Sequence, residues 1–320
     1  YGLRVVAGFE HEFQLIDDSP PSQPFSLSAQ RQFDPLGPEL MNALLQGGVQ
    51  PELFFAEYAP HQFEIPVTPA QGLASADRSV ILKEIVRDVS RRHGVRASFA
   101  PLLDPASAGN GVHIHVSLAD GAGQPVLYDP SRPGCLSEIG EPFAAGILSH
   151  ADALSALTAP SPVSAMRLTP HRWSVGAVCL AEANREALLR IPSTVALAGS
   201  EPAGQLRLEY RGADAAANPY LALGGLVRAG LDGLRAQLPA PPILGEDPSE
   251  LDEHERARYG VGAMPDSLEA SLEALARDET VRACLKPLLY DAYVGVKRSE
   301  LQAAEGLDIG ELCRRYASIY

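Results

Sequence analysis

The sequence predicts an α+β fold built on a mainly antiparallel, curved sheet with flanking helices. Two observations predict it. Strand-like apolar segments come in groups separated by a few long amphipathic helices, and strands and helices do not alternate strictly along the chain. With 320 residues, 46% of them hydrophobic and 21% charged, the chain can bury a large core and has the composition of a globular protein. A chain of this length could form one large domain or two ordinary ones.

The first third of the chain predicts strands by apolar density and Phe, Val and Ile content. They are residues 3–16, two short strands in 53–66 joined around Pro60, 95–103 and 112–118. A Pro-, Ser- and Gln-rich stretch over 19–38 predicts a loop. Helices are predicted over 38–46, which Gly47 and Gly48 close, and over 72–92, where basic residues and Gly94 give an end signal.

The remainder predicts longer helices between shorter strands. An apolar run favours a helix over 135–157, and Asn218-Pro219 opens an Ala- and Leu-rich helix to about residue 234. Strands are expected near 174–180, 186–191 and 205–211. Residues 237–265, which are Pro-rich and then acidic, predict a segment at the protein surface. Ser267 is predicted to start another helix.

Composition narrows the possible partners. The net charge is −14 and no long basic run is present, so nucleic acid is not expected as a partner. No stretch approaches the length of a membrane span. The four scattered cysteines form no CxxC pair, which favours a reducing compartment and a cytoplasmic location. Because the chain begins with Tyr1 and enters a strand within a few residues, we expect it to be part of a longer protein.

Six residues of metal-ligand type lie inside the strand-like segments. They are Glu10, Glu12, Glu57, Glu64, His113 and Glu209. Alternate residues of a strand share a face, so Glu10 and Glu12 project together. A Glu-x-Glu pair on an exposed strand usually marks only a solvated face, but here the flanks are Phe, Val, Leu and Ile. Buried carboxylates require pairing or a metal, and this oxygen-rich set with one imidazole indicates Mg²⁺ or Mn²⁺.

Two further patterns point to phosphate chemistry. His113 and His115 share one strand face and follow a turn containing Gly109 and Gly111, where the backbone can approach a ligand closely. A lone strand histidine is more often a core residue than a ligand, and two histidines on one face shift the odds toward ligand binding. Five arginines lie downstream, and although a surface charge ladder is the simpler reading, guanidinium groups grip carboxylate and phosphate. They are Arg167, Arg185, Arg190, Arg207 and Arg211.

An ordered set of motifs resembles the catalytic domain of glutamine synthetases and their γ-glutamylamine-forming relatives. It includes Glu10-His-Glu12, the segment from Glu57 to Glu64, Gly109-Asn-Gly-Val-His113-Ile-His115, Asn184-Arg185 to Arg190, Arg207-Leu-Glu209-Tyr-Arg211 and Asn218-Pro-Tyr. The resemblance runs over nearly all of the chain. It implies that residues 1–320 form one catalytic domain with the glutamine synthetase/guanido kinase-like fold, and that the family's smaller N-terminal domain is absent from this chain.

The resemblance also implies roles by position. Glu12, Glu57 and Glu64 would hold one metal, and Glu10, His113 and Glu209 a second one at the ATP phosphates. His115 and Ser117 would lie by the nucleotide, with Gly109 and Gly111 in the binding loop. Arg185, Arg190 and Arg207 would contact phosphates, while Arg167 and Arg211 would face glutamate and the transferred phosphoryl group. The implied enzyme is an ATP-dependent, ADP-forming glutamate–ammonia or glutamate–amine ligase that assembles as a ring-type homo-oligomer.

Three positions depart from the family pattern. Ala108 stands where the family has an Asn that holds glutamate, and Trp173 stands where it has the catalytic Glu of a flap. Leu102-Leu103 replaces a Lys-Pro pair. A Trp cannot act as a carboxylate, so we expect a larger or more apolar amine than ammonia, or a different acid. Two alternatives stay open: a catalytically silent, nucleotide-binding relative with a regulatory role, and a metal-dependent phosphotransferase or hydrolase acting on another small acid.

Overall fold

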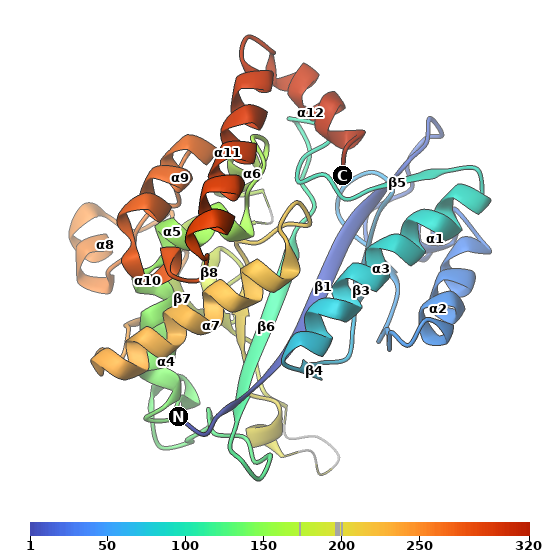
Figure 1. The fold of residues 1–320 in the computed structure, drawn as a ribbon. Coiled ribbons are helices and arrows are strands. Elements are labelled where there is room, and N and C mark those ends of the chain that lie inside the picture. The colour runs from blue at the N-terminus through green and yellow to red at the C-terminus, as the bar shows by residue number, and fades with distance from the viewer. Residues whose placement is uncertain (173, 196–198, 200) are drawn as a thin grey trace.

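A mixed, mostly antiparallel sheet forms the centre of the molecule, with helices packed around it (Figure 1). The computed structural model describes residues 1–172, 174–195, 199 and 201–320. In those ranges the strand order is β10-β7-β8-β9-β6-β1-β3-β2, and β4 and β5 also pair with β1. Only the β10–β7 and β7–β8 pairs are parallel among these. The α+β prediction is confirmed. The strands are β1 Arg4–Ile16, β2 Phe55–Ala56, β3 Gln62–Pro66, β4 Ala70–Gln71, β5 Arg96–Ser98, β6 Val112–Ala119, β7 Ala177–Glu182, β8 Ala187–Ile191, β9 Leu208–Tyr210 and β10 Ile243–Leu244.

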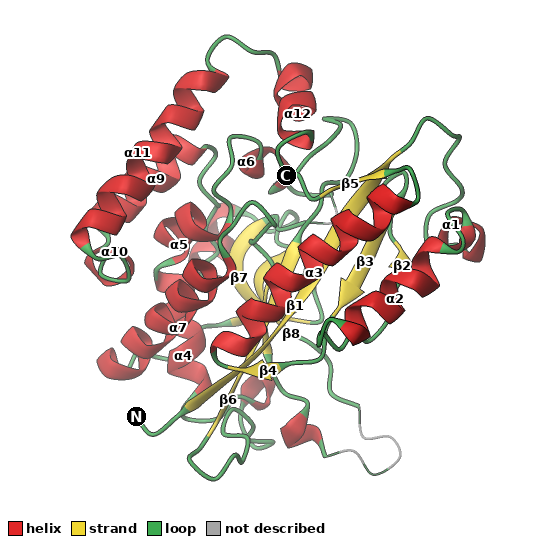
Figure 2. Ribbon diagram, turned by 45° about the vertical axis from the view of Figure 1, so that its right-hand side comes forward, coloured by secondary structure: helices red, strands yellow, loops and turns green. Residues whose placement is uncertain are grey.

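The helices lie in two groups on either side of the long central strands (Figure 2). One group is α1 Leu27–Arg31, α2 Leu36–Gln46 and α3 Leu73–Arg92. The other group contains α4 Gly140–Ser149, α5 Ala151–Thr158, α7 Pro219–Ala236, α9 Leu268–Arg277, α10 Glu279–Arg282 and α11 Pro287–Ala304. The remaining helices are α6 Ser164–Arg167, α8 Glu253–Tyr259 and α12 Ile309–Ala317. Helix α3 packs on α2 and β1, α4 on α7, and α5 on α9.

Strand β1 shows how the sheet separates core from site. Phe9, His11 and Phe13 point to one face and are buried. His11 Nε2 lies 2.7 Å from Ser79 Oγ on α3, so this face is covered by that helix. The intervening Glu10 and Glu12 therefore project from the opposite face, as period-two geometry requires.

Most predicted elements are confirmed, and two expectations are wrong. The helix expected over 135–157 is broken into α4 and α5, which meet at His150. Its imidazole lies 2.6 Å from Asp278 and 3.3 Å from Asp232, contacts with distant segments that a local apolar pattern cannot reveal. The loop expected over 19–38 contains α1, whose first turn is capped by the Ser26 side chain.

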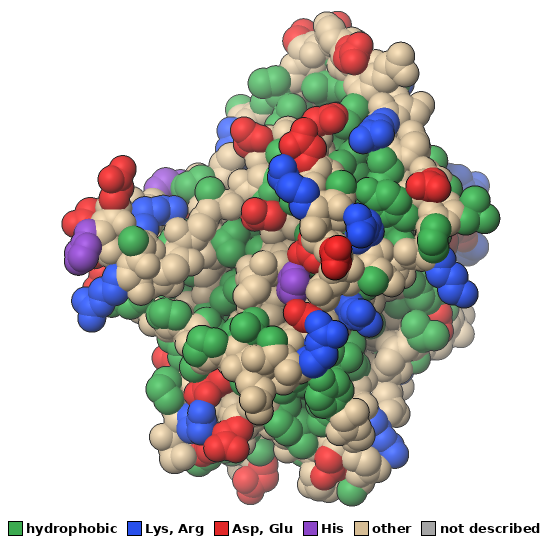
Figure 3. All heavy atoms as spheres, turned by 60° about the vertical axis from the view of Figure 1, so that its left-hand side comes forward, with side chains coloured by type: hydrophobic (Ala, Val, Ile, Leu, Met, Phe, Trp, Pro, Cys, Tyr) green, Lys and Arg blue, Asp and Glu red, His purple; other side chains and the backbone are tan. Residues whose placement is uncertain are grey.

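The surface carries charges of both signs. On the face shown in Figure 3, acidic and basic side chains are interspersed with apolar ones rather than gathered by sign. Among the described residues, no helix is both long and apolar enough to cross a membrane.

Candidate active site

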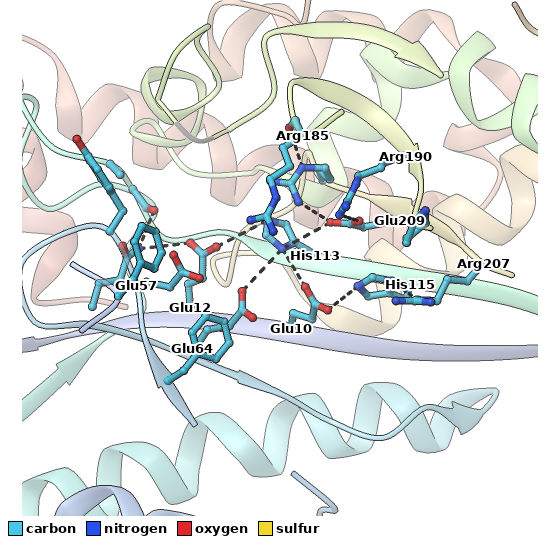
Figure 4. Close-up of a pocket in the computed structure, with 18 of the residues that line it drawn as sticks. Glu10, Glu12, Glu57, Glu64, His113, His115, Arg185, Arg190, Arg207 and Glu209 are labelled. Carbon is cyan, nitrogen blue, oxygen red and sulfur yellow. Dashed lines mark hydrogen bonds and ion pairs between the residues drawn. The ribbon is translucent and has the colours of Figure 1, made fainter. Parts of the chain in front are cut away.

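Strand register assembles the acidic and histidine side chains. In the antiparallel ladders Glu10 pairs with His113, Glu12 with Glu64, and His115 with Glu209. Four strands therefore deliver these side chains to one face of the sheet. Figure 4 shows them converging.

His113 lies at the middle of this cluster. Its Nδ1 is 3.2 Å from Glu10 Oε2, 4.0 Å from Glu64 Oε2 and 3.9 Å from Glu209 Oε1. On the other side of the ring, Nε2 is 3.7 Å from Glu12 Oε1. The sequence-predicted ligands other than Glu57 are thus within reach of a single imidazole.

Two groups of these side chains have geometry that suits a metal ion. In each group, one ligand atom from every residue lies within 4.8 Å of the others: Glu10, Glu64 and His113 in one, Glu10, His115 and Glu209 in the other. Clustered carboxylate oxygens with imidazole nitrogens fit Mg²⁺ or Mn²⁺. The grouping differs from the one implied by resemblance, since Glu10 is shared and His115 joins the second group.

His115 lies between the guanidinium of Arg207 and the carboxylate of Glu10. Its Nδ1 accepts a hydrogen bond from Arg207 Nε at 3.0 Å, and its Nε2 lies 2.8 Å from Glu10 Oε1. An Nδ1 that accepts carries no proton, so in the neutral ring the proton is on Nε2, toward Glu10. Any metal ligation by His115 would displace that proton.

The carboxyl groups divide into two electrostatic classes. Burial, and then the neighbouring Glu12, raise the pKa of Glu57 to about 7, and burial with Glu10, Glu12 and Glu57 raises the pKa of Glu64 well above its ordinary value. Burial opposes ionisation of Glu209 too, but Arg211, His113, His115 and Arg190 lower its pKa to about 2. Carboxyls with raised pKa values gain most from a bound cation.

These side chains line one pocket of about 480 Å³. Its wall consists of Glu10, Glu12, Phe25, Phe55, Glu57, Tyr58, Gln62, Glu64, Ala108, Gly109, His113, His115, Arg185, Arg190, Pro192, Ser193, Arg207, Glu209 and Arg211. Figure 4 shows Glu57 at one side of the pocket and Arg207 and His115 at the other. We call the side formed by His115, Arg190, Arg207 and Glu209 the arginine end. We call the side formed by Phe25, Phe55, Glu57, Tyr58 and Ala108 the aromatic end.

The predicted arginines are held by specific contacts. Arg190 Nη1 donates to Glu209 Oε2 at 2.7 Å, and Arg211 Nη1 pairs with Glu209 Oε1. Arg211 Nε also donates to the carbonyl of Arg185 at 2.8 Å. Ser117 lies outside this pocket and lines an adjoining one of about 230 Å³ with His115 and Arg207.

Arg167 does not line the pocket. Its side chain is 2% exposed and donates to Ser174 Oγ at 2.9 Å and to the Ala213 carbonyl at 2.8 Å. It packs behind the loop that carries Gly109 and Gly111, so closely that a Cβ on Gly109 would lie 2.7 Å from Arg167 Cγ and 2.1 Å from the Pro101 carbonyl. Arg167 therefore supports this loop, and its predicted contact with the substrate stays a prediction.

Gln62 and Asn110 were not singled out from the sequence, yet they fix this loop. Gln62 Nε2 donates to the Gly109 carbonyl and to Asn110 Oδ1, both at 2.9 Å, and lies 3.3 Å from Glu12 Oε2. The Gly111 N–H donates to Glu12 Oε2 at 2.8 Å. A Gln placed two residues before the ligand Glu64 shares its strand face, and that spacing was the available signal. Trp173 lies outside the described residues.

The chain is similar in sequence to known proteins. Residues 1–307 match the family model described as glutamine synthetase, catalytic domain. The chain is 41% identical over 270 residues to gamma-glutamylpolyamine synthetase GlnA3 of Streptomyces coelicolor, which covers 84% of this chain and 57% of that protein. It is 32% identical over 307 residues to glutamine synthetase of Thermus thermophilus, covering 92% of this chain and 67% of that protein.

Solved structures agree. One described as a novel glutamine synthase homolog superposes over the whole chain with a TM-score of 0.90 at 43% identity, covering 71% of that protein. A GmaS/ADP complex superposes over the whole chain with a TM-score of 0.83 at 27% identity and 74% coverage. The chain thus spans a little over half the length of the first-named relative. The fold, the carboxylate–histidine cluster and the family match together show that the chain belongs to the glutamine synthetase family and contains its catalytic domain.

Proposed function

We propose that this pocket ligates a carboxylic acid, glutamate, to an amine other than ammonia, using ATP and releasing ADP and phosphate. The observation that carries the proposal is the gathering of five carboxylates, two histidines and four arginines around one cavity. Divalent cations and arginines around a cavity are the recurring equipment of phosphoryl transfer. The matched family and GlnA3, named as a gamma-glutamylpolyamine synthetase, support the ligase reading.

The acidic and the basic side chains of the pocket have different proposed roles. The groups Glu10–Glu64–His113 and Glu10–His115–Glu209 would hold Mg²⁺ or Mn²⁺, and Glu12 and Glu57, which were also predicted as ligands, line the same pocket. Bound cations would neutralise phosphate charge as the γ-phosphoryl group moves to the acid. Arg185, Arg190, Arg207 and Arg211 line the same wall and can orient phosphate and carboxylate oxygens through paired N–H donors.

The reaction has two steps. A carboxylate oxygen of the acid attacks the γ-phosphorus of ATP, and the bond to the bridging oxygen breaks to give ADP and an acyl phosphate. The amine then attacks the acyl carbon, inorganic phosphate leaves, and the amine nitrogen loses a proton. The chain's own contribution is to hold acid and phosphate in line, for which the loop pinned by Gln62, Asn110 and Arg167 gives a rigid wall.

A second candidate is metal-dependent nucleotide binding without turnover. It is favoured by Ala108, which lines the pocket where the family's glutamate-holding Asn is expected, and by Arg167, which is buried behind the loop. The ring-type homo-oligomer stays a prediction.

The test is a substrate panel on the full-length protein. We expect ADP release with Mg²⁺ or Mn²⁺ only when glutamate and a matching amine are both present, and a product whose mass equals glutamate plus amine minus water. A Glu138→Gln variant serves as control, since that carboxylate is exposed, pairs with Arg132 and does not line the pocket. ATP binding without ADP release for every acid–amine pair would select the second candidate, and phosphate transfer without amide formation would select a phosphotransferase.

A further inference from the structure

Two aromatic rings form a wall at the aromatic end of the pocket. Phe25 and Tyr58 come from separate segments, and their ring centroids lie 6.3 Å apart at 44°. Both line the pocket although they remain 52% and 44% exposed. Exposed aromatic faces that line a polar cavity mark a candidate binding surface.

The backbone holds Phe25 in a rare conformation. Its φ is +57°, which bulky side chains seldom adopt. The Ser26 N–H and Oγ bond to the Gln23 carbonyl at 3.3 and 2.6 Å, which fixes the turn. Gln30 on α1 donates to the Phe54 carbonyl, so the segment is tied to the strand that leads to Glu57. A strained residue held by its surroundings points to a functional requirement.

Tyr58 is fixed from the other side. The Glu57 N–H donates to the Gln62 carbonyl at 2.8 Å, and the Ala59 N–H donates to Gln62 Oε1 at 2.8 Å. The same Gln62 side chain contacts the loop that carries Ala108. Tyr58, Glu57 and Ala108 thus belong to one rigid unit on this side of the pocket.

The charge at this end complements an ammonium group. Glu57 and Glu12 both line the wall, and across the described ranges no basic side chain forms an ion pair with Glu57, although Arg185 and Arg211 lower its pKa from farther away. Ala108 contributes only a methyl group to the same wall. A carboxylate beside aromatic faces and a methyl group fits a cation that carries a hydrocarbon chain.

We infer that Phe25 and Tyr58 form the specificity wall for the amine substrate, and that they select a primary aliphatic amine with a chain of several carbons. Its ammonium nitrogen would face Glu57, and its methylene groups would cover the two rings. The inference rests on the proposed ligase function and names the amine class that this function would use. A monoamine and a diamine share this chemistry.

The experiment compares amines of increasing length on the full-length protein. Ammonia, methylamine, propylamine, butylamine and 1,4-diaminobutane are assayed with glutamate, ATP and Mn²⁺ by ADP release. We expect kcat/KM to rise about three- to fourfold for each methylene that the wall covers. Phe25→Ala and Tyr58→Ala each should lower kcat/KM for butylamine about tenfold while ATP binding stays unchanged. A faster reaction with the diamine than with butylamine identifies a diamine, and equal rates identify a monoamine.

Matched variants distinguish loss of the aromatic wall from general damage to the protein. Tyr58→Phe keeps the ring and should keep the chain-length preference, and Leu27→Ala, an exposed change on the same segment, should leave every rate unchanged. An unchanged chain-length preference in both alanine variants, with ADP still released, overturns the inference and leaves the proposed function standing.

A binding measurement covers the case without turnover. If no acid–amine pair releases ADP, the proposed function fails, and butylammonium chloride is titrated calorimetrically into the protein with Mg²⁺–ADP. Binding that Phe25→Ala weakens about tenfold supports the wall. No binding by the wild-type protein, or equal binding by both, overturns it.

Discussion

The two ends of the pocket are built on different principles. At the arginine end, regular strands carry most of the functional side chains. There Glu209 forms ion pairs with Arg190 and Arg211, and Arg207 donates a hydrogen bond to His115. At the aromatic end, turns carry Phe25 and Tyr58, and Glu57 has no ion pair within the described residues. The proposed phosphoryl transfer would therefore depend on the sheet, whereas the proposed selection of the amine would depend on segments that can vary without disturbing the sheet.

The largest expected effect comes from breaking the arginine end. Glu209→Gln keeps the size of the side chain but removes a candidate metal ligand and the partner of two arginines. We expect metal-dependent ATP affinity, measured by calorimetry, to fall by at least about 100-fold, because even outer contacts of metal sites contribute 10–100-fold. Glu209→Ala should abolish that binding as well, with an added loss of stability of about 3–5 kcal/mol from uncompensated buried guanidinium groups.

The matched control for Glu209 is Glu138→Gln, which neutralises an exposed carboxylate paired only with Arg132. That variant should bind ATP as the wild type does. Circular dichroism and thermal unfolding would show that Glu209→Gln remains folded. Wild-type ATP affinity in a folded Glu209→Gln protein would refute the metal assignment of this end.

A smaller effect is expected from titrating Glu57, at the aromatic end, and the neighbouring Glu64. Glu57 has a folded pKa of about 7 and Glu64 one well above its ordinary value, whereas the unfolded chain titrates near 4.5. Between about pH 5 and pH 7 these two carboxyls therefore bind more protons in the folded state than in the unfolded state, and their contribution to the stability of the metal-free protein falls as pH rises. Buried His11, whose pKa is lowered by burial and by Lys83, contributes the opposite slope in this window. The contribution of Glu57 and Glu64 to the Tm in chelator should decrease across the window, and added Mn²⁺ should raise Tm more at pH 8 than at pH 5.5 because it binds the ionised carboxyls.

Glu57→Gln tests the source of that slope. The variant cannot titrate at this position, so its metal-free Tm should fall less steeply with pH than that of the wild type. Glu10 and Glu209 have lowered pKa values and act below about pH 4.5, outside the window. An identical slope in wild type and variant would show that the pKa of Glu57 is not raised in the folded protein.

The acidic and histidine side chains on the strands could be predicted from the sequence because strands have a simple period. Glu10 and Glu12, and likewise His113 and His115, lie two residues apart and share a face, which the ladder register confirms. The flanking apolar residues showed that the carboxylates are buried. The α+β class followed from the grouping of strands, although the break at His150 depends on contacts with Asp232 and Asp278 that are distant in sequence.

The two rings of the aromatic end were not predicted, for a physical reason. Phe25 and Tyr58 lie in turns without periodicity, and only tertiary contacts through Gln30 and Gln62 bring them to the pocket. The contacts of Arg167 were not predicted either. Its guanidinium donates to Ser174 and to the Ala213 carbonyl beside the tightly packed Gly109, which depends on tertiary structure, and its predicted role at the substrate stays a prediction.

The smallest expected effect separates stability from selectivity at one residue. Phe25 has a φ of +57°, a region that glycine enters freely and that costs other residues roughly 1–2 kcal/mol. Phe25→Gly and Phe25→Ala both delete the ring and its contact with Tyr58, so both should lose the preference for longer amines equally. Because alanine keeps the backbone strain, and glycine trades it for unfolded-state entropy, we expect the glycine variant to be more stable by about 0.5–1 kcal/mol. Chemical unfolding measures that difference and chain-length kinetics measure the shared loss. If the glycine variant were the less stable of the two, the left-handed turn would not be strained. If the two variants differed in amine preference, the ring would not be the element that selects the substrate, and the contrast between the two ends would rest on backbone shape instead.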